Sequence, residues 1–456
     1  MAYDVIVLGG GPGGYLAAER AGAAGLRVLC IEDRHLGGTC LNEGCIPTKA
    51  LLHSGRLFAQ AKAGAACGVT AEKLTLDHRA VLERKDRIVR TLVDGVAATL
   101  RSCHVEVVNA RGVLAGRTAE GHAVEAGGET YVGKSLILAT GSSCAVPPIQ
   151  GLQEGLASGF VMTNREILDM PQLPKRLAVL GGGVIGLEMA TYFAMAGVET
   201  TVLEMLDHIG GAGDRELLSI LQKNCEALGL KFLLGAKVTA VQDGCVVYEQ
   251  AGQICQLPAD RVLLSIGRRP NTDGIGLEQA GICTERGAVV TDERMRTNIP
   301  GIYAIGDING KAMLAHTAYR EAEVAVHAIL GVQDRMRYDA IPSVLFTAPE
   351  LSSVGMSEEA ARSEGRAVKT VKIPMGYSGR YIVENERRDG VCKLVFDQAT
   401  GALLGAQVLS DSSSEFIAAA AICIEMELTA KDMQEIVFPH PTVSEILREA
   451  ACKYKG

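Results

Sequence analysis

The sequence has no long apolar run and no cluster of basic residues. No stretch reaches the ~18–20 consecutive apolar residues that cross a bilayer, and the formal net charge is −8. A membrane protein and a nucleic-acid-binding protein are therefore disfavoured as function classes. The amino terminus lacks the basic segment and cleavage site of a signal peptide, so we expect a cytoplasmic protein.

The sequence also lacks the features of a disulfide scaffold. Its 13 cysteines are odd in number and scattered, which favours a reducing compartment. In that compartment a close pair of cysteines is more often catalytic or metal-binding than structural. The chain of 456 residues exceeds the ~250–300 residues at which a single core stops growing, so about two to four domains are expected.

Glycine, in contrast, is abundant, and it gathers in two matched segments. Each segment follows a short apolar run, Tyr3–Leu8 or Arg176–Leu180, and has the spacing Gly-x-Gly-x-x-Gly. A helix-like stretch and a second apolar run follow, and an acid stands 18 residues after the last glycine (14 to 32, and 186 to 204). The residues are Gly9, Gly11, Gly14 and Glu32 in the first segment, and Gly181, Gly183, Gly186 and Glu204 in the second.

This spacing has a physical reason in proteins that bind dinucleotides. The first glycine permits a tight turn, the second lets the backbone approach a pyrophosphate, and the third lets the helix pack on the strand. The phosphates face the positive end of the helix dipole, and the acid accepts hydrogen bonds from a ribose 2′-hydroxyl. Two matched segments predict FAD in one site and NAD(P) in the other. Because Glu204 would repel a 2′-phosphate and no arginine stands among residues 205–208, we predict NAD.

Cys40 and Cys45 lie five residues apart in a glycine-rich stretch. In a regular helix this separation gives a rise of ~7.5 Å and points the side chains ~140° apart, whereas a disulfide needs Cα atoms within ~4.4–6.8 Å. A bond between them therefore requires a distorted turn, which Asn42 and Gly44 permit. Pro47 suits a first helical turn, which places Cys45 near a helix N-terminus, where a thiolate is stabilised.

The stretch Gly37–Lys49 resembles the active-site signature of the pyridine nucleotide–disulfide oxidoreductases. Matching motifs extend over nearly the whole chain and are Ala139-Thr140-Gly141, Gly306-Asp307, Thr347-x-Pro349-Glu350 and His440-Pro441-Thr442-Val443-Ser444-Glu445. The resemblance implies an α/β fold, with two Rossmann-like dinucleotide-binding domains and a C-terminal α+β dimerisation domain. The implied boundaries are 1–145 for the first part of the FAD-binding domain, 146–268 for the NAD-binding domain, 269–340 for a central domain completing the FAD site, and 341–456 for the dimerisation domain. In this last region the sequence pattern shows strand-like runs and two helical stretches.

Within the family, the chain is most similar to the flavoprotein components of 2-oxoacid dehydrogenase and glycine cleavage complexes. The similarity implies a homodimer that works with the lipoyl domains of such a complex, oxidises dihydrolipoamide to lipoamide and reduces NAD⁺ to NADH. FAD and a redox-active Cys40–Cys45 disulfide would carry the electrons.

The similarity also implies roles for individual residues. His440, a natural proton carrier near neutral pH, would be the acid–base of the reaction. Glu445 would orient the His440 ring, and His440 would reach the cysteines across the dimer interface. Lys49 would lie beside the flavin and pair with Glu188. Further FAD contacts are implied for Thr140, Gly141, Asp307 and Ala315, with His316 in a segment near the flavin, and a further NAD contact is implied for Gly267.

Several alternatives stay open at the level of the sequence. A glutathione-reductase-like enzyme would prefer NADPH and carry arginines after the second strand-end acid. Mercuric reductase needs a cysteine pair near the C-terminus, where only Cys452 is present. The chain could instead be a scaffold or redox sensor, and its two close cysteines could be unrelated or half of a zinc site. The sequence departs from the family pattern at Ala322, where glycine is frequent, and in the more basic stretch 386–389.

Overall fold

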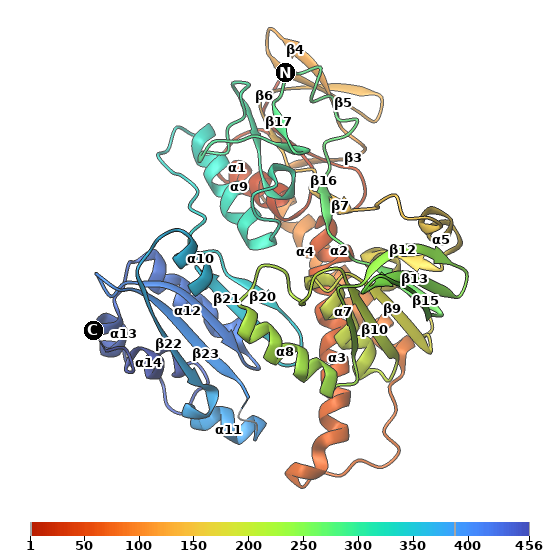
Figure 1. Cartoon of the computed structure of the whole chain (residues 1–456). Coiled ribbons are helices and arrows are strands. Elements are labelled where there is room, and N and C mark those ends of the chain that lie inside the picture. Colours follow the sequence, from red (N-terminus) through yellow and green to blue (C-terminus); the bar gives the residue numbers. More distant parts are fainter. Residues whose placement is uncertain (1, 387–388, 456) are drawn as a thin grey trace.

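The computed structural model describes residues 2–386 and 389–455. Figure 1 shows an upper unit, a right-hand unit and a lower unit that holds the C-terminal quarter of the chain. Residues 387–388 of the basic stretch noted above lie outside the described part. Within the described part, no helix is both long and apolar enough to cross a bilayer.

The upper unit is built on a parallel sheet with the strand order β3-β2-β1-β6-β19. The strand β6 also begins an antiparallel extension through β5 and β4. The central strands β1 and β2 are almost entirely buried, as continuous apolar runs require, whereas the edge strand β3 is only partly buried. The helix α1 packs beside α9 against the sheet. The bounds are β1 Tyr3–Leu8, β2 Val28–Glu32, β3 Glu106–Asn109, β4 Val113–Thr118, β5 Gly121–Ala126, β6 Glu129–Leu138, β19 Ile302–Ala304, α1 Pro12–Ala23 and α9 Ala315–Ile329.

The right-hand unit repeats this plan. Its parallel sheet has the order β11-β10-β9-β15-β8, so both units carry the fingerprint strand between its two parallel neighbours. A three-stranded antiparallel meander, β12-β13-β14, is attached. The bounds are β8 Val161–Met162, β9 Arg176–Leu180, β10 Glu199–Glu204, β11 Lys231–Leu234, β12 Lys237–Gln242, β13 Cys245–Gln250, β14 Gln253–Pro258, β15 Arg261–Leu264, α5 Leu152–Ser158, α6 Asn164–Ile167, α7 Val184–Met195 and α8 Arg215–Ala227.

The upper and right-hand units are joined by the packing of α3 and by a pair of chain crossings. The helix α3 follows the short helix α2, leaves the upper unit and packs against α7 and α4. The two chain crossings pair with each other as the antiparallel strands β7 and β16. The bounds are α2 Gly38–Glu43, α3 Cys45–Ala63, α4 His78–Ser102, β7 Ser142–Cys144 and β16 Arg268–Pro270.

The lower unit is a five-stranded antiparallel sheet, β20-β21-β24-β23-β22, with five α-helices in its described residues. The sequence predicted only two helical stretches, and this was wrong. Four of the helices have six or seven residues, too few to display a helical hydrophobic period. The bounds are β20 Ser343–Leu345, β21 Leu351–Gly355, β22 Val368–Pro374, β23 Val391–Asp397, β24 Leu403–Leu409, α10 Glu358–Ser363, α11 Gly379–Asn385, α12 Ser413–Glu425, α13 Ala430–Glu435 and α14 Ile446–Ala451.

The architecture confirms the predicted α/β class, with two Rossmann-like units and a C-terminal α+β unit. Both glycine segments lie where the sequence placed them, between the first strand and the first helix of their units. The four numerical domain boundaries remain a proposal.

Candidate functional site

The first glycine of each fingerprint adopts a backbone conformation that side chains rarely allow. Gly9 and Gly181 both have φ of +103°. A Cβ atom would lie 2.2 Å from the Ala139 carbonyl oxygen at Gly9, and 2.5 Å from the Ser265 carbonyl oxygen at Gly181. Only glycine therefore fits either turn.

The other two glycines divide into a packed position and an open one. A Cβ on Gly14 would lie 1.8 Å from the Gly9 oxygen, and one on Gly186 would lie 2.0 Å from the Gly181 oxygen. Gly183 has no heavy atom within 4 Å of such a Cβ, and at Gly11 the nearest is at 3.8 Å. Each turn thus leaves its middle glycine open toward the helix N-terminus, which suits the pyrophosphate of a dinucleotide.

The two strand-end acids brace these turns in the same way. Glu32 accepts the N–H of Gly10 at 2.6 Å, and Glu204 accepts the N–H of Gly182 at 2.7 Å. Their second oxygens accept the N–H two residues further on, at 2.8 Å in both cases. Each carboxylate is held at the strand end, where it can meet a ribose. The sequence predicted the acids but not this bracing of the glycine turns.

One arginine that the sequence analysis missed lies near the second turn. Arg215 donates from Nη2 to both carboxylate oxygens of Asp207, at 2.9 and 3.0 Å, and this lowers the pKa of Asp207 to about 2. The same loop lies against the glycine turn, since Gly210 donates its N–H to the Gly182 oxygen at 2.8 Å. The arginine is engaged by Asp207, which leaves Glu204 as the charge at the ribose position and favours NAD over NADP.

The two crossings form a polar junction between the dinucleotide units. Thr140 and Asn271 exchange two hydrogen bonds of 2.8 Å. The Ser142 hydroxyl donates to Asp307 and accepts from Arg268 Nε at 2.7 Å. Ser142 and Arg268 were not predicted, because a serine and an arginine on short strands carry no sequence signal. The junction fixes two predicted flavin contacts, Thr140 and Asp307, relative to the second unit.

A buried glutamate supports the turn that carries Asp307. Glu321 is completely buried and accepts from Gly306 N at 2.6 Å, Asn309 Nδ2 at 2.9 Å and the Tyr338 hydroxyl at 2.6 Å. Burial raises its pKa, and these hydrogen bonds oppose that rise. Ala322, where the family often has glycine, follows Glu321 on α9. Its methyl group is buried in the core of the upper unit.

The remaining predicted contacts lie around these turns. Gly141 and Gly267 have φ of +72° and +122°, with open space where a Cβ would stand. Ala315 begins α9. His316 Nε2 lies 2.8 Å from the Pro342 oxygen, so the ring is engaged with the connection to the lower unit.

The two cysteines stand on either side of the distorted turn that their spacing demands. Cys40 lies in α2 and Cys45 is the first residue of α3, separated by Gly44 with φ −147° and ψ −110°. Both are free thiols, and a side-chain hydrogen bond connects them. That bond, assisted by nearby Lys49 and opposed by partial desolvation, lowers the pKa of Cys45 to about 7, while the pKa of Cys40 is raised. The N-terminus of α3 and the Lys49 ammonium therefore favour the thiolate at Cys45.

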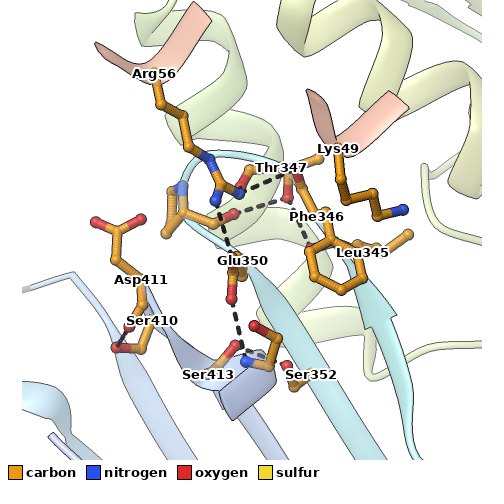
Figure 2. Close-up of polar contacts among 12 residues, drawn as sticks. Lys49, Arg56, Leu345, Phe346, Thr347, Glu350, Ser352, Ser410, Asp411 and Ser413 are labelled. Atoms are coloured by element: carbon orange, nitrogen blue, oxygen red, sulfur yellow. Dashed lines mark hydrogen bonds and ion pairs between the residues drawn. The ribbon is translucent and has the colours of Figure 1, made fainter. Parts of the chain in front are cut away.

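The cation beside Cys45 is part of a partly buried ion pair. Lys49 Nζ donates to the two oxygens of Glu188 at 2.8 and 3.0 Å, and it lies 4.2 Å from the centre of the Phe346 ring (Figure 2). Phe346 donates its N–H to Glu188 at 3.2 Å. The ion pair that the resemblance implied is therefore present, and Phe346 is an unpredicted third member from the lower unit.

The histidine pair lies elsewhere in the single chain. His440 Nδ1 is 2.8 Å from Glu445 Oε2, and the ring is 76 % exposed whereas Glu445 is 13 % exposed. Figure 1 shows α13 and α14, which flank this pair, on the side of the lower unit away from α2 and the start of α3. An oriented, exposed histidine is suited to meet cysteines of a second copy.

The comparisons with known proteins match this arrangement. The model of the pyridine nucleotide-disulphide oxidoreductases covers residues 3–322, and that of their dimerisation domain covers residues 341–451. The chain belongs to this family. Members use FAD and NAD, and the two glycine turns fit both cofactors. The dimerisation domain supports a homodimer.

Curated relatives span the whole chain. A dihydrolipoyl dehydrogenase of Chlamydia muridarum is 39% identical, over 99% of this chain and 96% of the relative. One from Bacillus subtilis is 39% identical, over 98% of this chain and 95% of the relative. Among solved structures, LpdA from Mycobacterium tuberculosis superposes with a TM-score of 0.89 at 26% identity, covering 98% of this chain and 99% of that one. The flavoprotein disulfide reductase RclA from Escherichia coli gives 0.87 at 29% identity, over 99% and 100%.

The lowered pKa of Cys45 predicts a pH-dependent absorbance band in this disulfide oxidoreductase. A thiolate held against a flavin produces long-wavelength charge-transfer absorbance. In the two-electron-reduced holoenzyme this band is expected above pH 7 and should be lost as the pH falls through about 7. Lys49→Met removes a cation that lowers the pKa of Cys45, so the midpoint should move upward, by roughly one pH unit. A spectrophotometric pH titration of both proteins measures this, and an unshifted midpoint in the variant would exclude the role of Lys49.

Proposed function

We propose that this flavoprotein oxidises dihydrolipoamide to lipoamide and reduces NAD⁺ to NADH. The observation that carries the proposal is the position of Cys45: it begins α3, shares a hydrogen bond with Cys40 and lies one helical turn before the Lys49–Glu188 pair. A helix N-terminus and a nearby cation stabilise a thiolate. Full-length relatives named dihydrolipoyl dehydrogenase support the choice of substrate.

In the proposed reaction, His440 of one subunit takes the proton of a substrate thiol. The resulting thiolate forms a bond to Cys40 Sγ as the Cys40–Cys45 bond breaks, and Cys45 leaves with the electron pair. The second substrate thiol then attacks the first substrate sulfur as the bond to Cys40 breaks. Its proton passes to Cys40, which leaves as a thiol, and lipoamide is released. Bound FAD supplies the two-electron carrier between the dithiol and the nicotinamide. Gly9, Gly11 and Gly14 would hold FAD, and Gly181, Gly183 and Gly186 would hold NAD.

We further propose that the partners are lipoyl domains of a 2-oxoacid dehydrogenase or glycine cleavage complex, and that the protein works in the cytoplasm. A lipoyl group on a mobile arm would deliver both thiols in one molecule, as the exchange at Cys40 requires.

The test is an assay of the FAD-loaded protein with dihydrolipoamide and either NAD⁺ or NADP⁺, beside oxidised glutathione with NADH or NADPH. We expect NADH formation from dihydrolipoamide and NAD⁺, at least roughly tenfold faster than with NADP⁺. Preferred reduction of glutathione by NADPH would establish the glutathione-reductase-like alternative. Reduction of the protein by NADH without turnover of any disulfide would establish a redox sensor instead.

A further inference from the structure

The face of α3 that carries the redox groups continues to a third residue, Arg56. It lies 11 residues after Cys45 and 7 after Lys49 in the sequence (45 to 56, and 49 to 56). With 3.6 residues per turn, these separations bring the three side chains onto one stripe of the helix.

Arg56 fastens a segment of the lower unit to this stripe. Its Nη1 donates to Glu350 Oε1 at 3.0 Å, and its Nη2 donates to the carbonyl oxygens of Phe346 and Thr347 at 3.2 and 2.9 Å (Figure 2). One planar guanidinium therefore engages three acceptors at the start of the dimerisation domain. An arginine is suited to this task because its donors form a rigid fork.

The same segment contacts the pair beside Cys45. Phe346 donates its N–H to Glu188, and its ring lies under the ammonium of Lys49. Phe346 is thus fixed at its carbonyl by Arg56 and at its N–H by Glu188. A shift of this residue would move the support on which Lys49 rests.

Glu350 anchors the same segment to the rest of the dimerisation domain. Its side chain is 5 % exposed, its second oxygen accepts the N–H of Ser414 in α12 at 3.1 Å, and its own carbonyl accepts from Ser410. A nearly buried carboxylate without its cation is strongly destabilising. The Arg56–Glu350 pair therefore connects α3 to the sheet and to α12 of the dimerisation domain.

We propose that Arg56 is a positioning residue of the redox centre. Through Glu350 and the carbonyls of Phe346 and Thr347, it holds Phe346 against the Lys49–Glu188 pair and so fixes the cation next to Cys45. The inference rests on the proposed function, because that function places the pair and Cys45 beside the flavin. It also means that the dimerisation domain supports the redox centre directly, in addition to supplying His440.

The test compares Arg56→Met with the unmodified holoenzyme by the pH titration of the charge-transfer band and by steady-state kinetics. We expect the midpoint to rise by roughly 0.5–1 pH unit, because Lys49 loses its fixed place. We expect kcat with dihydrolipoamide to fall on the order of tenfold, as for a displaced reacting group, with KM for both substrates changed by less than about twofold. Arg56→Lys, which keeps the charge but not the fork, should shift both in the same direction by less.

Two further variants separate positioning from plain stability. Arg56→Met combined with Glu350→Gln removes the unpaired buried charge, so its thermal stability should exceed that of Arg56→Met while the band midpoint stays displaced. If the midpoint returned together with the stability, Arg56 would be merely structural and the inference would be overturned. The matched control is Arg84→Met. Arg84 lies in α4 and donates to the Ala50 carbonyl of α3 at 3.1 Å, so its loss affects α3 without changing the bonds to the Phe346 segment.

Arg84→Met should keep the midpoint of the unmodified enzyme, and an equal displacement there would also overturn the inference. Failure of the proposed function is recognised separately, since the unmodified protein would then show no turnover of dihydrolipoamide. An active unmodified enzyme with an undisplaced Arg56→Met midpoint would reject only the positioning role.

Discussion

Replacing Cys45 with serine is expected to abolish NAD⁺ reduction by dihydrolipoamide while leaving FAD bound. A serine oxygen can neither form the bond to Cys40 nor leave as a stabilised thiolate from the start of α3. Loss of a covalent participant of this kind lowers kcat by more than roughly 10³-fold. The side chain is exposed in the single chain and close in size to serine, so the fold and the glycine turns should be unaffected.

The measurement is the steady-state rate together with the flavin content of the purified variant. Cys67→Ser is the matched control, since Cys67 is an exposed thiol beyond the end of α3 that lies outside the proposed site. It should retain full activity. An active Cys45→Ser protein with normal flavin content would refute the assignment of the switch.

Replacing His440 with glutamine is expected to lower kcat by roughly 10²–10⁴-fold, the usual contribution of a general acid–base. The hydrogen bond from Nδ1 to Glu445 at 2.8 Å leaves Nε2 of the exposed ring available to a substrate thiol. Reduction of the enzyme by NADH should be much less affected, because that half-reaction does not require a substrate thiol to be deprotonated. Separate rapid-kinetic measurements of the two half-reactions check this.

Mixed dimers test whether His440 acts across the interface. Neither Cys45→Ser nor His440→Gln homodimers should show more than a small residual activity. A dimer with one chain of each kind holds one intact site if the histidine serves the partner's cysteines, so random mixing should restore about a quarter of the wild-type sites. No recovery after verified subunit exchange would place His440 with the cysteines of its own chain.

The sequence was sufficient for the residues whose chemistry dictates a local pattern. The glycines of both fingerprints are fixed by backbone sterics, and Gly9 and Gly181 share the same φ. The helix that starts at Cys45 could be predicted from Pro47 and from the spacing to Cys40. The Lys49–Glu188 contact, separated by 139 residues, was accessible only through the resemblance to a family.

The residues that the sequence missed are joined by tertiary structure alone. Arg56 and Glu350 are 294 residues apart, and neither belongs to a periodic pattern that brings them together. Phe346 has the sequence pattern of an ordinary core residue, and its contact with Lys49 becomes apparent only after the lower unit packs on α3. Asp207 and Arg215 are near in sequence, but a glycine-rich loop lets them meet, and loop geometry has no period.

Cys40 and Cys45 are expected to open and close as one redox switch, and thiol counting follows both sulfurs through the catalytic cycle. The oxidised holoenzyme is alkylated under denaturing conditions before and after addition of one equivalent of dihydrolipoamide without oxygen, and again after NAD⁺, with peptide mapping of all cysteines. We predict that two thiols appear on reduction, at Cys40 and Cys45, and disappear when NADH forms. Unchanged labelling of these two residues through the cycle would show that they are not the redox switch.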